Sequence, residues 1–316
     1  MALLSRNADR IFWAARYLER AEDTARLVQE FGELFDDMPT EHEGSHRWVP
    51  LLAVCGDAPD EDAPVEERAA TEREVVNELV CDPENPGSVT ACVSSARSNL
   101  RTTREVLPRE AWRTVNDLFL FMGSDGSRAE DRRFRAHVLG RVANDSRRLD
   151  GILTSSMTRD AAWEMWRLGR YLERADMTTR VVGVRAASLM AHDDGAREYD
   201  EVQWMGVLRS LSALQMYQRA TRGPIEASSV VRFLLFDDQF PRAVRFCLDE
   251  LDRCLDRLSR PDMVRVAVAQ ARTALMSTMA TTDDGADLDS AMELVQSLLG
   301  QVNGAITERF LSIDPG

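Results

Sequence analysis

A repeated hexapeptide constrains this chain more than any other feature of its sequence. The letters RYLERA occupy residues 16–21 and recur at residues 170–175, with a displacement of 154 residues. The similarity continues beyond the hexapeptide, where Glu22 corresponds to Asp176 and Arg26 to Arg180. Duplication of a helical unit is the natural explanation for such internal similarity. The repeat therefore predicts two helical halves, residues 1–156 and 157–316, packed as one compact unit.

Both copies of the hexapeptide read as helices that are buried on more than one side. Apolar residues of the first copy follow the three- and four-residue spacing of a packing seam, in which alanines allow a neighbouring helix to approach closely. A second stripe of this helix contains Phe12, Arg16, Glu19, Asp23 and Arg26. An unpaired buried ion is strongly unfavourable, so each glutamate should meet an arginine of the same or a facing helix. We predict that the two helices lie together in the interior, related by an approximate two-fold axis.

The remainder of the sequence also indicates helices. Apolar residues recur mostly at helical spacing, alternation of β-branched residues is nearly absent, and glycine and proline cluster between the periodic segments. We therefore predict an all-α protein, a helical bundle with an internal duplication and two central RYLERA helices. The expected helices span residues 8–35, 65–80, 88–105, 108–122, 128–153, 159–190, 199–222, 228–236, 241–258, 262–279 and 287–310, and residues 48–54 form a short apolar segment within the polar connection that follows the first helix.

The charge balance limits the classes of partner. The 39 basic and 53 acidic residues give a net charge of -14, which would repel nucleic acid and anionic lipid surfaces. All of the basic residues are arginine, because the chain contains no lysine. Lysine Schiff-base chemistry, an internal aldimine with pyridoxal phosphate and a P-loop lysine are therefore excluded. A genomic bias toward arginine codons explains this composition as readily as a function does.

Several familiar sites are not predicted. The five cysteines are scattered and form no CxxC pair, which argues against a disulfide framework and a thiolate zinc site. Residues 42–46, HEGSH, match the HExxH pattern of zinc peptidases. The match lies between Pro39 and Pro50 in an acidic connection, where no helix would present both histidines. Serine-hydrolase and nucleotide-binding glycine motifs do not occur. We predict no metal and no cofactor.

The sequence also gives an expectation for location. Residues 1–6 become charged before the apolar region of a signal peptide can develop, and no apolar run is long enough to cross a bilayer. We expect a cytoplasmic protein that does not enter the membrane.

The candidate functional residues are the charged groups of the repeat and a second arginine array. Arg97, Arg101 and Arg104 are spaced at i, i+4 and i+7 on one face of a predicted helix. Like charges stacked so closely need carboxylates or a bound anion opposite them. Two interpretations stay open: an ion-pair lattice that fixes helix register, or a polar pocket that binds an anionic ligand. The predicted pocket consists of Arg16, Glu19, Arg20, Arg97, Arg101, Arg170, Glu173 and Arg174.

The chain resembles the bacterial Alpha-E family over nearly its whole length. The resemblance rests on both RYLERA copies, on ARSNLR (96–101), WRTVN (112–116), MTRD (157–160) and FLLFDDQFPR (233–242). The Glu-Arg motif of that family corresponds here to Glu19-Arg20 and Glu173-Arg174. Members of the family resemble genomic companions of a circularly permuted ATP-grasp ligase and a transglutaminase-like cysteine peptidase, sometimes beside a proteasome-related peptidase. The resemblance implies a setting of ATP-dependent amide-bond formation or peptide tagging, and it identifies no catalytic residue.

Two hypotheses for the function follow. The first is an accessory or ligand-binding subunit that binds the ligase, or an acidic peptide or amino acid, through its arginines. The alternative is an enzyme of the same pathway, with Glu19 or Glu173 as general acid–base and Arg16, Arg170 or Arg97 holding a carboxylate or phosphate. A raised glutamate pKa in a closed pocket would favour the enzyme, whereas fully paired glutamates would favour the accessory subunit.

Overall fold

The computed structural model describes residues 3–37, 48–55, 71–190, 200–280 and 285–312, and this part of the chain contains helices and no strand. The prediction of an all-α bundle is confirmed. None of the helices in these ranges combines the length and the apolar character that crossing a membrane requires.

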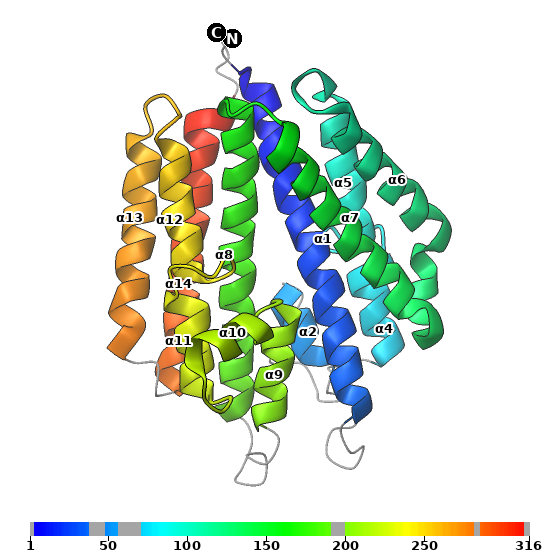
Figure 1. Ribbon diagram of the computed structural model, residues 1–316, viewed down its shortest axis with the longest axis vertical. Coiled ribbons are helices and arrows are strands. Elements are labelled where there is room, and N and C mark those ends of the chain that lie inside the picture. The colour runs from blue at the N-terminus through cyan, green and yellow to red at the C-terminus, as the bar shows by residue number, and fades with distance from the viewer. Residues whose placement is uncertain (1–2, 38–47, 56–70, 191–199, 281–284, 313–316) are drawn as a thin grey trace.

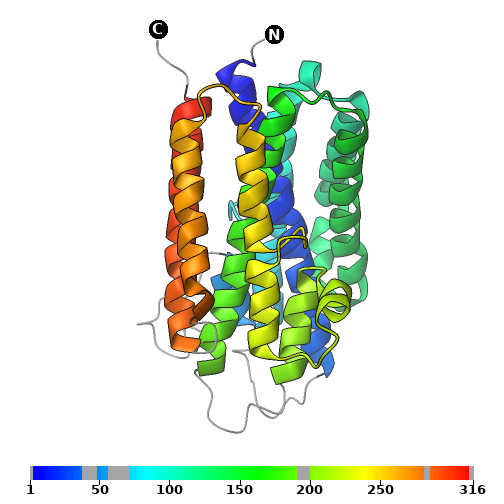
Figure 2. The same cartoon turned by 60° about the vertical axis from the view of Figure 1, so that its left-hand side comes forward.

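The main helices form two up-and-down units of four, joined through their longest members (Figure 1). In each unit the long helix packs against the second and fourth helices, and the third helix packs against the same two. Both views show the two units on opposite sides of the α1–α8 contact (Figure 2). The first unit comprises α1 (Ser5–Asp37), α5 (Val89–Arg101), α6 (Arg109–Asp125) and α7 (Arg132–Ser156). The second comprises α8 (Ala161–Met190), α12 (Val244–Leu255), α13 (Asp262–Ser277) and α14 (Gly285–Ile306).

Shorter helices connect the first and second members of each unit. One helix of each connection packs against the long helix of the other unit. The first unit contributes α2 (Val49–Cys55) and α4 (Glu72–Val76), which continues into a π-helical turn. The second contributes α9 (Asp200–Ser210), α10 (Leu214–Thr221) and α11 (Ala227–Phe236). Helix α2 packs against α8 of the other unit, and α9 packs against α1. This exchange ties the two units together beyond the α1–α8 contact.

The correspondence between the units extends to helix starts and single residues. Corresponding helices of the two units begin 153 to 156 residues apart; the pairs are α1 and α8, α5 and α12, α6 and α13, and α7 and α14. Before α5 and α12, the pattern Asp-x-x-x-Pro-x-x-Val-x-x-Cys occurs at Asp82–Cys92 and Asp237–Cys247. The Sγ of each cysteine donates to the carbonyl oxygen of its own proline, at 3.5 Å and 3.6 Å. We infer that residues 1–156 and 157–316 are tandem copies of one unit.

The closest approach of α1 and α8 depends on a glycine. A Cβ at Gly169 would lie 2.3 Å from the carbonyl oxygen of Phe12 and 3.1 Å from the Cβ of Ala15. Gly169 and Ala15 occupy equivalent positions of the two copies, so the helices cross at matching places. Both helices run in the same direction (Figure 1). The prediction that the two RYLERA helices lie together in the interior is confirmed.

Several expected helix boundaries were wrong for local reasons. The expected helix over 199–222 is two helices, because the chain turns at Ser212, which has a φ of 51°. The helix expected from Pro241 begins at Val244. The turn before it is anchored to α8, since Arg174 donates to the Pro241 carbonyl oxygen at 3.3 Å and the Thr178 hydroxyl to that of Arg242 at 3.0 Å. Ser88 is the N-cap of α5, and that helix ends at Arg101 rather than at the expected residue 105.

Candidate functional site

The centre of the α1–α8 interface is a reciprocal set of arginine–glutamate pairs. Arg16 Nε donates to Glu173 Oε2 at 2.6 Å, and Arg20 Nε donates to Glu173 Oε1 at 2.5 Å. In the other direction, Arg170 Nε and Arg174 Nε donate to the two carboxylate oxygens of Glu19, at 3.1 Å and 2.7 Å. Each glutamate therefore serves the two motif arginines of the other copy. This is the contact pattern that an approximate two-fold axis produces.

Arg16 and its counterpart Arg170 each make one further contact, and the two contacts differ in the charge of the partner. Arg16 Nη1 donates to Asn303 Oδ1 at 2.8 Å, and its counterpart Arg170 pairs with Asp150. Asp150 on α7 and Asn303 on α14 lie 153 residues apart, which is the offset between these two helices. The Glu19 side therefore has a carboxylate where the Glu173 side has a neutral amide.

Both motif glutamates are ionised. Burial alone would raise the pKa of Glu19, but Arg174, Arg242 and Arg170 outweigh it and hold this pKa far below its usual range. Burial opposes ionisation of Glu173 in the same way, and Arg16 and Arg20 lower its pKa. A carboxylate held in this state is a poor general acid or base near neutral pH.

The Glu19 side extends into a second cluster of charges. Arg242 Nη2 lies 3.1 Å from Glu19 Oε1, and its Nη1 donates to Asp23 Oδ1 at 2.6 Å. Arg26 Nη2 donates to the same Asp23 oxygen at 2.5 Å, and Asp23 Oδ2 has no partner in the described chain. Burial raises the pKa of Asp23, and nearby Glu19 and Glu22 add to that effect against Arg242 and Arg26. The Asp23 side of the cluster thus holds a carboxyl group with an unused oxygen.

Arginines outnumber carboxylates in the whole cluster. Its carboxylates are Glu19, Glu22, Asp23, Asp150, Glu173 and Asp176. Its arginines are Arg16, Arg20, Arg26, Arg147, Arg170, Arg174, Arg180 and Arg242. Two more positive than negative groups are therefore gathered here if all are ionised. The most exposed arginines of the cluster are Arg147, with 52% of its side chain exposed, Arg180, with 34%, and Arg20, with 29%.

Arg97 and Arg101 lie apart from these pairs. Arg97 Nε donates to Asn116 on α6 at 3.0 Å, and its guanidinium lies 4.3 Å from the ring centre of Phe119. Arg104 stacks on Trp112 at 4.0 Å, and Arg101 is exposed. Aromatic rings of α6 take the place of the expected carboxylates, and such cation–π contacts are favourable. Among the described residues, no hydrogen bond or ion pair joins Arg97 or Arg101 to the glutamate pairs.

Sequence reasoning identified part of this cluster and missed the rest. The buried stripe of α1 predicted the placement of Asp23 and Arg26, and both are buried. The sequence gives Arg242 no role beyond its place in the 233–242 segment that carries part of the family resemblance. Arg147 and Ser212 had no signal in the sequence, because their position depends on how α7 and the α9–α10 turn pack.

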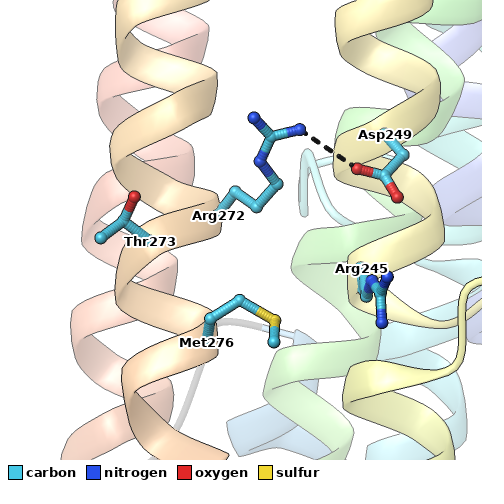
Figure 3. Close-up of a pocket in the computed structure, with 5 residues that line it drawn as sticks. All are labelled: Arg245, Asp249, Arg272, Thr273 and Met276. Carbon is cyan, nitrogen blue, oxygen red and sulfur yellow. Dashed lines mark hydrogen bonds and ion pairs between the residues drawn. The ribbon is translucent and has the colours of Figure 1, made fainter.

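Two surface grooves lie away from the paired glutamates. One, of about 440 Å³, lies between α12 and α13 and is lined by Arg245, Asp249, Arg272, Thr273 and Met276 (Figure 3). Arg272 Nη1 points toward Asp249 Oδ1 at 3.4 Å. The other, of about 300 Å³, lies between α5 and α6 and has serine and threonine side chains along an apolar floor. None of the predicted pocket residues lines either groove.

No described group of histidine, cysteine, aspartate and glutamate side chains is arranged to hold a metal ion. The HExxH match at residues 42–46 lies outside the described residues. Burial raises the pKa of the Cys92 and Cys247 thiols to about 12, so neither is poised as a thiolate.

The fold and the site define a class of all-helical proteins in which a Glu-Arg sequence of each half pairs with the other half. The chain belongs to the Alpha-E family, described as a predicted alpha-helical domain with a conserved ER motif, whose model matches residues 3–311. Uncharacterised proteins of Mycobacterium tuberculosis and Mycobacterium bovis are similar, with 25% identity over 255 residues, which is 76% of this chain and 28% of theirs. The chain therefore spans little more than a quarter of the length of these relatives. No solved structure matches it.

Proposed function

We propose that this chain is a non-catalytic accessory subunit that binds an acidic peptide or amino acid for a circularly permuted ATP-grasp ligase. The observation that carries the proposal is the surplus of arginine around the paired glutamates, together with the low pKa of both glutamates. Arginine suits this role because its planar guanidinium binds carboxylates bidentately and stays charged when partly buried.

The Glu173 side is where the ligand would bind. Arg16 and Arg20 share one glutamate there, and the third partner is neutral Asn303. The Nε of Arg20 is used by Glu173, whereas its Nη1 and Nη2 make no hydrogen bond to another described residue. A ligand carboxylate placed beside Arg20 would meet two free donors and an excess of positive charge.

The longer relatives support a partner domain. In the mycobacterial proteins the matching region is 28% of the chain, so an Alpha-E region works there beside a much larger remainder. Because Glu19 and Glu173 are held ionised, a role in presenting a ligand to such a remainder or to a separate ligase suits this domain better than acid–base catalysis by these two residues. A transglutaminase-like peptidase is a second candidate partner, which the family resemblance implies.

The enzyme alternative would need different residues from those first considered. Within the cluster, the carboxyl groups with raised pKa are Asp23 and Asp176, in both cases because of burial. Acid–base chemistry would fall on one of these rather than on Glu19 or Glu173.

Binding and turnover together test the proposal. We expect a tri-glutamate peptide to bind the purified chain in calorimetry, and Arg20→Gln to weaken that binding about tenfold, as loss of a charge-assisted hydrogen bond would. Arg113→Gln removes the same charge from an exposed site on α6 and should leave binding unchanged. The chain should stimulate ATP turnover by the ligase with its amino-acid substrate and show no turnover alone. Turnover by the chain alone would refute an accessory role.

A further inference from the structure

The turn between α9 and α10 holds a serine hydroxyl against two guanidinium groups. Ser212 Oγ accepts from Arg26 Nη1 at 2.6 Å and from Arg147 Nη2 at 3.3 Å. Arg26 is buried, whereas Ser212 and Arg147 are exposed at the surface above it. Two positive groups from α1 and α7 thus converge on one hydroxyl of a third element.

The backbone at this turn is unusual for serine. Ser212 has a φ of 51°, in the left-handed region that favours glycine. Non-glycine residues held in such a conformation occur often at ligand sites, where the surrounding structure fixes them. Helix α10 follows at once, and no side chain caps its first turn and no acidic residue lies in it. The N–H groups of the first turn of α10 therefore have no side-chain cap.

Two donors at this turn have no partner among the described residues, the Ser212 hydroxyl and the Arg147 Nη1 group. Both guanidiniums donate to Ser212 Oγ, so the hydroxyl proton is free for another acceptor. Arg147 uses its Nε on Glu22 at 3.2 Å and its Nη2 on Ser212, and its Nη1 has no partner among the described residues. Glu22 is buried and also faces Arg26 and Arg242, which leaves it little capacity to compensate Arg147.

We propose that Ser212 and Arg147 form an oxyanion-binding subsite, with Arg26 as the residue that positions the hydroxyl. The ligand is a carboxylate or phosphate group, whose oxygens accept from the Ser212 hydroxyl and from the free Nη1 of Arg147. The subsite uses none of the hexapeptide arginines and lies on the Glu19 side of the cluster. It stands independently of the accessory role proposed above, which depends on Arg20.

The test measures binding of two probes, inorganic phosphate and tri-glutamate peptide, by calorimetry at low ionic strength. We expect at least one probe to bind, and the probe that binds identifies the source of the anion. Arg147→Gln and Ser212→Ala should each weaken that binding about tenfold. The adjacent Arg148→Gln removes the same charge from an exposed residue of α7 and should leave the affinity unchanged.

Ser212→Gly separates binding from folding. Glycine suits a φ of 51°, which offsets part of the stability lost with the hydrogen bond from Arg26, so this variant should melt at a higher temperature than Ser212→Ala and lose as much affinity, because both variants lack the hydroxyl. Binding of neither probe would overturn the proposal, as would equal affinities of Arg147→Gln and Arg148→Gln. Arg20→Gln should leave phosphate affinity at this subsite intact, so failure of the accessory role would not be mistaken for failure of the subsite.

Discussion

Gly169→Ala tests whether the close crossing of α1 and α8 holds the structure together. The added Cβ would lie 2.3 Å from the carbonyl oxygen of Phe12, whereas non-bonded heavy atoms pack at about 3.5–4.0 Å. The neighbour is a backbone atom, so no side-chain rotation can relieve the clash and the helices must separate by about 1 Å. That separation would also stretch the pair between Glu173 and Arg16. We expect a loss of unfolding free energy of about 3 kcal/mol or more, at the upper end for overpacking.

A matched glycine in α7 provides the control. A Cβ at Gly140 would meet nothing within 4 Å, so Gly140→Ala should gain stability by helix propensity alone, about 1 kcal/mol. Urea denaturation followed by circular dichroism measures both variants. Changes in unfolding free energy of opposite sign for the two variants would support the close crossing of α1 and α8. A Gly169→Ala variant as stable as the parent chain would refute it.

Three further predictions concern titration, thiols and metal. Glu19 and Glu173 have pKa values below the ordinary 4.5, so their contribution to stability is present above that pH and is lost as the pH falls toward the lowered values. The unfolding free energy measured by denaturation should therefore be smaller at about pH 3.5 than at about pH 6. Cys92 and Cys247, with thiol pKa values of about 12, should resist alkylation at about pH 8 in the folded chain and react in denaturant, as mass spectrometry can measure. Elemental analysis should find no stoichiometric zinc, and His42→Ala should leave the melting temperature unchanged.

The sequence predicted the elements whose signal is local or repeated. The hexapeptide located the two central helices, and the stripe through Asp23 and Arg26 showed that α1 carries buried charge. A second repeated pattern, from Asp82 to Cys92 and again from Asp237 to Cys247, was present and would have extended the duplication to α5 and α12.

The remaining site residues depend on tertiary packing. Nothing local shows that the helical pattern over 199–222 breaks at Ser212, since serine rarely adopts its backbone conformation. The pairing of Arg242 with Glu19 and Asp23 joins residues more than 200 positions apart. The expected carboxylate partners of Arg97 are replaced by aromatic rings, because α6 places Phe119 and Trp112 against its guanidinium group.

The unfolding free energy of Glu173→Gln tests the central claim most directly. The substitution keeps the shape of a fully buried side chain and leaves Arg16 and Arg20 without their counter-charge, which should cost about 3–5 kcal/mol. Glu293→Gln changes the same charge at an exposed position of α14 and should stay within about 0.5 kcal/mol of the parent chain. If Glu173→Gln is no less stable than Glu293→Gln but loses ligand binding or pathway activity, the motif glutamate is a functional group and the account of it as a structural counter-charge is wrong.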